Sequence, residues 1–308
     1  MNRRLKSISL RISRRLLALT LLTAVATLLA DSAASMRVET SLTEGKLYQG
    51  QTVCLTVKFY SSSPDIEFVD LYRPFEVGGL TLLRVRRANT DDGMLERKGK
   101  GKNEYQAVVY RAMLLVNDAD EVEIPSIDFS VGIPGYTTYD HPFYGNVRQK
   151  YVDEQIVSTK PLKRKVSRLP AEPETFTGAI GDFTIEGSVP PGEIYSGGTA
   201  LVQFRIKGTG LLEEDDAPDV RLSLPSGITL KSQTAETGSI AEGDKLRSEL
   251  VADCHLSVPE AGEFVIAPVK FTFFDPASRR YRTVESKSLT IKVEETEIPS
   301  GPVIFHSI

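Results

Sequence analysis

Apolar and polar residues alternate along much of this chain, which predicts β-strands. The alternation is clearest in four stretches: 53–59, 201–206, 264–274 and 289–293. The apolar positions of the first stretch are Val53, Leu55, Val57 and Phe59. A period of two places one set of side chains on the core face of a sheet and the other set toward water. After the first 35 residues, no long stretch has the 3.6-residue period of a helix, so we expect an all-β protein.

Turn-forming residues separate these stretches. Clusters of Gly, Pro, Asn and Asp occur at 89–93, 117–120, 190–192 and 260–262. Such residues supply the tight turns that join antiparallel strands. Short strands spaced by turns predict immunoglobulin-like antiparallel β-sandwiches. The chain has no Trp and no pair of Cys that brackets two strands, so a true antibody-type domain is not expected.

The pattern occurs twice. Residues 38–59 align with residues 185–206 at a constant offset of 147. The identical positions are Glu39/Glu186, Ser41/Ser188, Gly45/Gly192, Tyr48/Tyr195, Gly50/Gly197 and Thr52/Thr199. The copies also end alike, because 124–129 matches 266–271 and 157–166 matches 284–293. A repeat of this length indicates two tandem copies of one folded unit.

The repeat divides the chain. We expect a first sandwich at 36–168, a linker with two prolines at 169–175, a second sandwich at 176–295 and a tail at 296–308. A short linker with two prolines is stiff, so the two sandwiches should hold a restricted angle. The first copy has 27 residues between Phe129 and Val157, whereas the second has 12 between Phe271 and Val284. The first copy therefore carries 15 additional residues at that point.

The first 35 residues have the layout of a secretory signal. Six basic residues precede an uncharged apolar run at 16–30, and small residues follow at 32–35. This order predicts export with cleavage after Ala34 or Ser35. The alternative is an uncleaved anchor, but the 15-residue run is shorter than the ~20 residues that a spanning helix needs. No later stretch is apolar enough to span a membrane, so we expect a soluble mature chain.

Charge and cysteine content narrow the function classes. Removing residues 1–35 takes away six basic residues and one acidic residue, which leaves 31 basic and 40 acidic residues and a net charge of −9. An acidic exported protein is a poor candidate for binding nucleic acid. Cys54 and Cys254 lie in different copies at positions that do not correspond, which argues against a structural disulfide. Cys254 alternates in phase with Leu256, so we expect it to be buried.

Several phrases along the chain resemble the BatD family, the oxygen-tolerance (aerotolerance) proteins of bacterial envelopes. The phrases are 103–105 with 123–125, 140–145, 181–183 with 207–210, and 271–276 with Tyr281, Thr283 and Ser286. They cover roughly residues 40–295, and Leu211 stands where the family often has Asn. The resemblance implies immunoglobulin-like domains that face the periplasm and have no catalytic residues. It implies work with von Willebrand A-domain membrane proteins and a MoxR-type ATPase in stress tolerance or envelope maturation.

The additional residues of the first copy are rich in aromatic rings, which makes them a candidate partner-binding site. The rings belong to Tyr136, Tyr139, Phe143, Tyr144 and Tyr151. Exposed aromatic side chains favour binding because they bury a large area at low entropic cost. The simpler alternative is that this loop folds back over the end of the sandwich or fills the interface with the second copy.

Two charged runs are weaker candidates. The acidic run comprises Glu213, Glu214, Asp215 and Asp216. We interpret it as a partner contact, with a solvated loop as the simpler alternative and no match to a calcium-binding loop. The basic run at 97–102 lacks the order of a phosphate-binding loop, so a solvated hairpin tip is the simpler interpretation.

No catalytic or metal-binding motif is present. The histidines, at 141, 255 and 306, are far apart, and neither His-Glu-x-x-His nor Gly-x-Ser-x-Gly occurs. We therefore expect no enzyme activity, no cofactor and no small-molecule ligand. The sequence leaves two functions open: an exported interaction protein that binds envelope proteins, and a glycan-binding or adhesin-like module.

Overall fold

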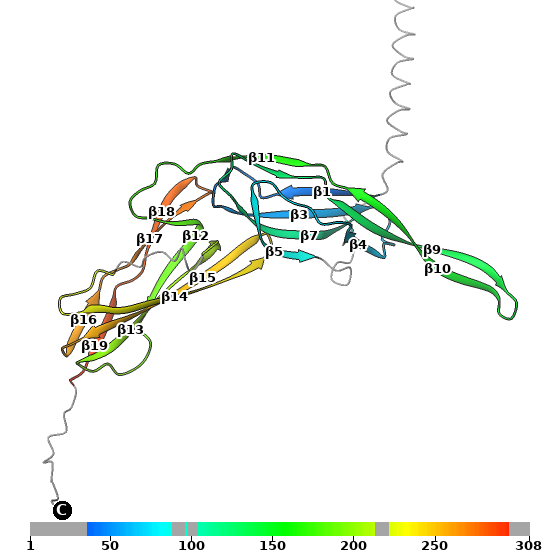
Figure 1. The fold of residues 1–308 in the computed structure, drawn as a ribbon. Helices are drawn as coiled ribbons and strands as arrows, with labels where there is room; N and C mark the ends of the chain where they lie inside the picture. The colour runs from blue at the N-terminus through cyan, green and yellow to red at the C-terminus, as the bar shows by residue number, and fades with distance from the viewer. Residues whose placement is uncertain (1–35, 88–95, 98–103, 213–221, 296–308) are drawn as a thin grey trace, which may run out of the picture.

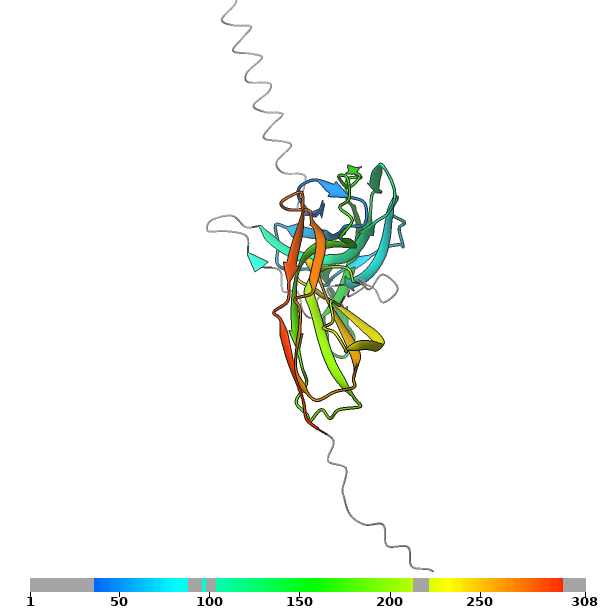
Figure 2. The ribbon, with the colours of Figure 1, turned by 90° about the vertical axis from the view of Figure 1, so that its left-hand side faces the viewer.

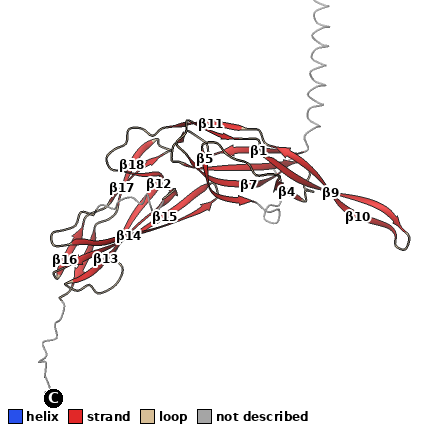
Figure 3. Cartoon of the chain, viewed as in Figure 1, coloured by secondary structure: helices blue, strands red, loops and turns tan. Residues whose placement is uncertain are grey.

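The computed structural model describes residues 36–87, 96–97, 104–212 and 222–295, and all regular structure in these ranges is β-strand (Figure 3). The expected signal at 1–35 and the tail at 296–308 lie outside the described residues. The strands form two sandwich-like units that follow one another along an elongated molecule (Figure 1). The first described strand, β1 (Met36–Leu42), lies in the first unit, and the last, β19 (Leu289–Val293), lies at the far end of the second (Figure 1 and Figure 2). The prediction of an all-β fold built from sandwiches is confirmed.

Within its described residues, the first unit contains three sheets. The largest has the order β1 (Met36–Leu42), β3 (Thr52–Ser61), β7 (Tyr105–Val116) and β5 (Leu80–Arg87), with β6 (Glu96–Arg97) also paired to β7. The second has the order β10 (Gly145–Ser158), β9 (Asp128–His141) and β4 (Phe68–Leu71). The third has the order β2 (Leu47–Tyr48), β11 (Leu162–Ser167) and β8 (Glu121–Ile124). Side chains from all three sheets form one apolar core.

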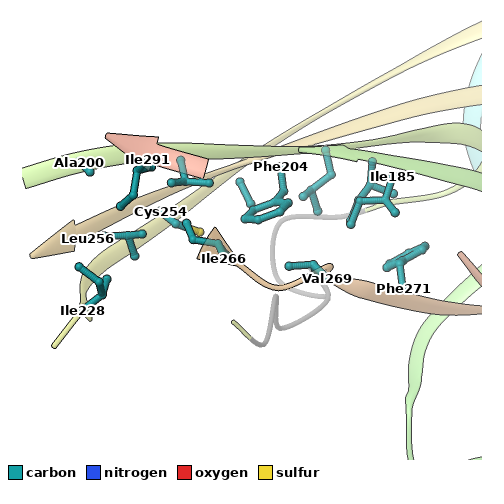
Figure 4. Close-up of a cluster of buried hydrophobic side chains, with 14 of the residues drawn as sticks. Ile185, Ala200, Phe204, Ile228, Cys254, Leu256, Ile266, Val269, Phe271 and Ile291 are labelled. Atoms are coloured by element: carbon teal, nitrogen blue, oxygen red, sulfur yellow. The ribbon is translucent and has the colours of Figure 1, made fainter. Parts of the chain in front are cut away.

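The second unit contains a large sheet and a short strand pair. The large sheet has the order β14 (Thr229–Glu242), β15 (Lys245–Val258), β13 (Gly198–Gly210), β12 (Phe176–Ser188), β17 (Lys270–Asp275) and β18 (Arg280–Glu285). The pair is β16 (Gly262–Ile266) with β19 (Leu289–Val293). Its core packs Phe204 and Cys254 from the large sheet near Ile266 and Ile291 from the pair (Figure 4). Cys254 is fully buried, as its alternation with Leu256 predicts.

The sequence repeat is also a repeat of strand pairing. Ile124 is paired with Leu162 in the first unit, and the matching residues Ile266 and Leu289 are paired in the second. Tyr48 pairs with Ser167 in parallel, and Tyr195 forms the equivalent parallel bridge to Glu294. Even the turn before the second repeated strand is the same: Gly50 has a φ of 76° and Gly197 a φ of 77°. These positive values explain why both copies keep glycine there.

In β3 of the first unit, the burial of Cys54 departs from the predicted alternation of buried and exposed side chains. Val53, Leu55, Val57 and Phe59 point into the core as predicted. Cys54 belongs to the opposite face, which was expected to meet water, yet it is only 4% exposed. The reason is a contact between the units: Leu246, near the start of β15, packs against Cys54 and Met113. Alternation predicts two faces, but it does not reveal that a second unit covers one of them.

A second apolar contact joins the units beside the linker. The Tyr48 ring packs edge-on against Phe274 at a centroid distance of 4.8 Å, and Ile180 completes the cluster. The Tyr281 hydroxyl donates to the Pro170 carbonyl at 3.0 Å, which fastens the linker to β18. A Cβ atom at Gly50 would lie 2.8 Å from the Ile180 side chain, so the close approach of the units also favours glycine here.

Candidate interaction surface

The additional residues of the first copy form a long hairpin rather than the loop that we expected. Strands β9 and β10 stay paired without a break from Asp128↔Ser158 to His141↔Gly145. Strand β4 accompanies β9 only as far as Gly132. Beyond that point the hairpin projects from the sandwich and away from the second unit (Figure 1). We call residues 133–153 the arm.

The candidate rings lie on the arm and on its turn, and all five are exposed. Their exposed fractions are 53% for Tyr136, 45% for Tyr139, 88% for Phe143, 79% for Tyr144 and 51% for Tyr151. The simpler alternative, in which the rings cover the sandwich end or fill the interface between the units, is therefore wrong. A regular hairpin explains the result, because continued backbone pairing satisfies the amides while the side chains remain in solvent.

The turn of the arm gathers rings around His141, which lies far from the other two histidines in sequence. The His141 ring lies 4.9 Å from Tyr144, 6.2 Å from Phe143 and 6.4 Å from Tyr139, between ring centroids. The backbone N–H of Phe143 donates to His141 Nδ1 at 3.2 Å. The proximity of residues 139–144 in sequence was a signal for this cluster. Only the turn geometry brings the four rings together.

Further along the arm, neighbouring side chains fix the orientation of two rings. The guanidinium of Arg148 lies 3.9 Å above the centre of the Tyr136 ring, which is the geometry of a cation–π contact. The Tyr151 ring covers Gly135 on the opposite strand so closely that a Cβ atom there would lie 2.4 Å from the ring. Both rings are thus held in place before any partner arrives, which lowers the entropic cost of binding.

An ion pair and a hydrogen bond connect the arm and its base to the body of the first unit. The Lys150 ammonium donates to Glu67 at 2.5 Å, and this hydrogen bond raises the pKa of Lys150. Ser130 donates to the carboxylate of Glu154 at the base of the hairpin. Exposed pairs of this kind contribute little stability.

The structure does not place the acidic run or most of the basic run relative to the arm. Glu213, Glu214, Asp215 and Asp216 lie outside the described residues, and so do residues 98–102 of the basic run. The described chain stops just after β13, whose last residue, Gly210, lines a cleft of about 410 Å³ between the two units. Charges of both signs line that cleft, among them Asp244, Lys245 and Arg279. This mixture does not favour a ligand of either charge.

The cysteine side chains and His255 have structural positions in the sheets of the described residues. Cys54 and Cys254 are both free thiols and both buried, and burial raises the pKa of Cys254 to about 11. His255 lies on the face of β15 opposite to Cys254 and is partly exposed. Across the described ranges, no three His, Cys, Asp or Glu side chains gather in a way that could hold a metal ion.

No described helix has the length and apolar character that crossing a bilayer requires.

No protein-family model and no curated protein matches the chain. Among solved structures, the chain is similar to the C-terminal domain of the Streptococcus pyogenes antigen I/II-family protein AspA. That match has 10% identity, covers 84% of this chain and 99% of the other, and has a TM-score of 0.20. A TM-score this low supports no conclusion about function.

Proposed function

We propose that this chain is an exported, non-enzymatic interaction protein of the BatD type, and that it binds its partners through the arm. The partners that the resemblance implies are periplasm-facing von Willebrand A-domain membrane proteins that work with a MoxR-type ATPase. The observation that carries the proposal is a projecting hairpin that bears five exposed rings along its length, two of them, Phe143 and Tyr144, in its turn.

The physical argument starts from the cost of exposed rings. Aromatic side chains bury roughly 150–250 Å² each, so Phe143 and Tyr144 together offer on the order of 300 Å². A typical interface buries about 800 Å² on each partner, with a few aromatic anchors near its centre. The two tip rings are therefore large enough to form such a centre, and the rest of the arm would supply its rim.

A capture experiment tests this proposal. Tagged protein of residues 36–308 would be expressed in its source bacterium, the envelope crosslinked, and bound proteins identified by mass spectrometry. We expect a von Willebrand A-domain membrane protein to be enriched over a mock bait. The variant Phe143→Ala/Tyr144→Ala should reduce that recovery by at least about tenfold, because aromatic anchors often contribute 2 kcal/mol or more.

The matched control is Tyr72→Ala/Tyr195→Ala, which removes two exposed tyrosines outside the arm. It should leave recovery unchanged. The proposal is wrong if no von Willebrand A-domain protein is enriched, or if the tip variant recovers as much as the control.

The ring cluster at the turn supports a second candidate, binding of envelope glycans. Tyr139, His141 and Tyr144 combine flat apolar faces with polar edges within one turn. Tyrosine side chains of this kind provide amphipathic contact area. A glycan array probed with the same protein would show specific signals that the tip variant loses, and an array without signals would remove this candidate.

A further inference from the structure

The outer edge of β10 is open along the arm. Strand β10 is the terminal strand of its sheet, and within the described part of the chain it pairs only with β9. After Gly145 it contains neither glycine nor proline. The outer edge of β9 differs, because Pro134 lies just beyond the end of β4 and has no N–H to donate. The β10 edge, which no proline interrupts, is therefore the better suited of the two to accept another strand.

The charges on β10 are separated along its length. Arg148 and Lys150 lie in the half nearer the turn, whereas Asp153 and Glu154 lie in the half nearer the base. Edge strands usually avoid pairing by carrying charges, lysine above all, that repel another copy. In an antiparallel pair of two β10 strands, however, the basic half of each would face the acidic half of the other. This arrangement attracts a second copy.

We propose that two copies of this chain join through their β10 edges, antiparallel, about a twofold axis at Tyr151. The inference builds on the proposed function, since it identifies a second copy as one occupant of the arm. The product would be a four-stranded ribbon with β10 of each copy in the middle and one body at each end.

Hydrogen-bond geometry limits the possible registers. Along a strand, every second residue directs both its N–H and its C=O toward the same edge, and in an antiparallel pair residues that face each other direct these groups either toward or away from one another. When two copies of β10 pair, two residues that face each other must therefore be an even number of positions apart in the sequence. The twofold axis then passes through a residue and not between two residues. The central choices are Lys150, Tyr151 and Val152.

An axis at Tyr151 fits the charges best. It places Arg148 of each copy opposite Glu154 of the other, and it sets Gln149 opposite Asp153. An axis at Lys150 would place two lysines opposite each other, which is unfavourable. An axis at Val152 would place Glu154 opposite Lys150, which already pairs with Glu67, and would leave Arg148 opposite the apolar Ile156. In the described structure Arg148 stacks on Tyr136 without a carboxylate partner, and Glu154, which accepts one hydrogen bond from Ser130, keeps acceptor capacity for it.

The same register carries the turn of each arm to the base of the other. Residue 144 of one copy would lie opposite residue 158 of its partner. Phe143 and Tyr144, the most exposed rings of the arm, would then gain a neighbour. The ring-bearing surface of the proposed function would be built from both copies.

Charge exchange tests the pairing. Sedimentation velocity of residues 36–308 over a range of concentrations should show a reversible dimer. Arg148→Glu and Glu154→Arg each place like charges opposite one another twice, so each should raise the dimer dissociation constant about tenfold or more. An equimolar mixture of the two variants should restore dimerisation, because every 148–154 contact then joins opposite charges.

Two controls make the same charge changes on other edge strands: Arg86→Glu on β5 and Glu236→Arg on β14. Both should dimerise like the wild type, and circular dichroism checks that every variant is folded. A wild type that stays monomeric at all concentrations overturns the inference. So does a mixture that fails to dimerise, or an Arg148→Glu variant that dimerises normally.

The inference can fail separately from the proposed function. A monomeric chain that still captures a von Willebrand A-domain protein through Phe143 and Tyr144 would overturn only the β10 pairing. A charge-dependent dimer that captures no such protein would support the pairing and contradict the proposed function.

Discussion

Asp275 illustrates how a single side chain holds a turn. It accepts hydrogen bonds from the Ala277 N–H at 2.9 Å, the Ser278 hydroxyl at 2.8 Å and the Arg282 guanidinium at 3.4 Å. Burial by itself would raise the pKa of this carboxyl, but the hydrogen bonds outweigh burial, and the pKa lies below its ordinary value.

The lowered pKa of Asp275 gives a pH prediction. A group whose pKa is lower in the folded state stabilises the fold above the unfolded pKa of about 3.9 and loses this effect as pH falls through the folded value. We expect Asp275→Asn to reduce the free energy of unfolding by about 1–3 kcal/mol at neutral pH. The difference from wild type should shrink as the pH is lowered below 4, in urea titrations at several pH values. Asp182→Asn, which removes an exposed partner of the same Arg282, should change stability by less than about 1 kcal/mol.

The two thiols should be inert in the folded protein. Cys54 and Cys254 are buried, and burial raises the pKa of both, to about 11 for Cys254. The thiolate is the reactive form, so a thiol reagent at neutral pH should label neither residue in native buffer and both in denaturant. Labelling of either thiol in native buffer would contradict the prediction, and labelling of Cys54 alone would indicate that its contact with Leu246 opens.

At the scale of elements, the arm is separable from the core. No residue between 136 and 150 belongs to the apolar core of the first unit. We expect that replacing residues 136–150 with Asn-Gly, a favoured two-residue turn, would lower the free energy of unfolding by no more than about 1 kcal/mol. The main loss is the exposed pair of Lys150 with Glu67. Thermal melts of the shortened and full chains check this, and a large drop in melting temperature would show that the arm supports the sandwich.

At the scale of the whole molecule, Leu246 couples the two units. Its side chain is 2% exposed and packs against Cys54 and Met113 of the first unit. Leu246→Ala should cost about 2 kcal/mol or more, as buried leucine truncations do. Because that cost falls on the contact between units, we expect thermal unfolding to divide into two transitions and small-angle scattering to show a broader range of shapes. Leu230→Ala, at a 43% exposed position of β14, is the control and should change neither.

The repeat also shows how the contact between the two units changes the burial of equivalent residues. Tyr48 and Tyr195 occupy the same repeat position and make the same parallel pairing. Yet Tyr48 is 3% exposed, because it packs against Phe274 of the second unit, and Tyr195 is 42% exposed. The shared sequence pattern produced the same strand pairing in both units, while burial depended on what lay across the interface.

The sequence by itself determined the local features of this protein. Alternation set which residues of β3 and β15 face the cores, because side-chain phase depends on neighbours along the chain, and the repeat predicted two copies of one folded unit. The tertiary structure decided the rest. It showed that the additional residues continue the pairing of β9 and β10 as an exposed arm, that His141 sits among the tip rings, and that Cys54 is covered by Leu246. These features depend on contacts between residues far apart in sequence or on the geometry of one turn, and side-chain periodicity records neither.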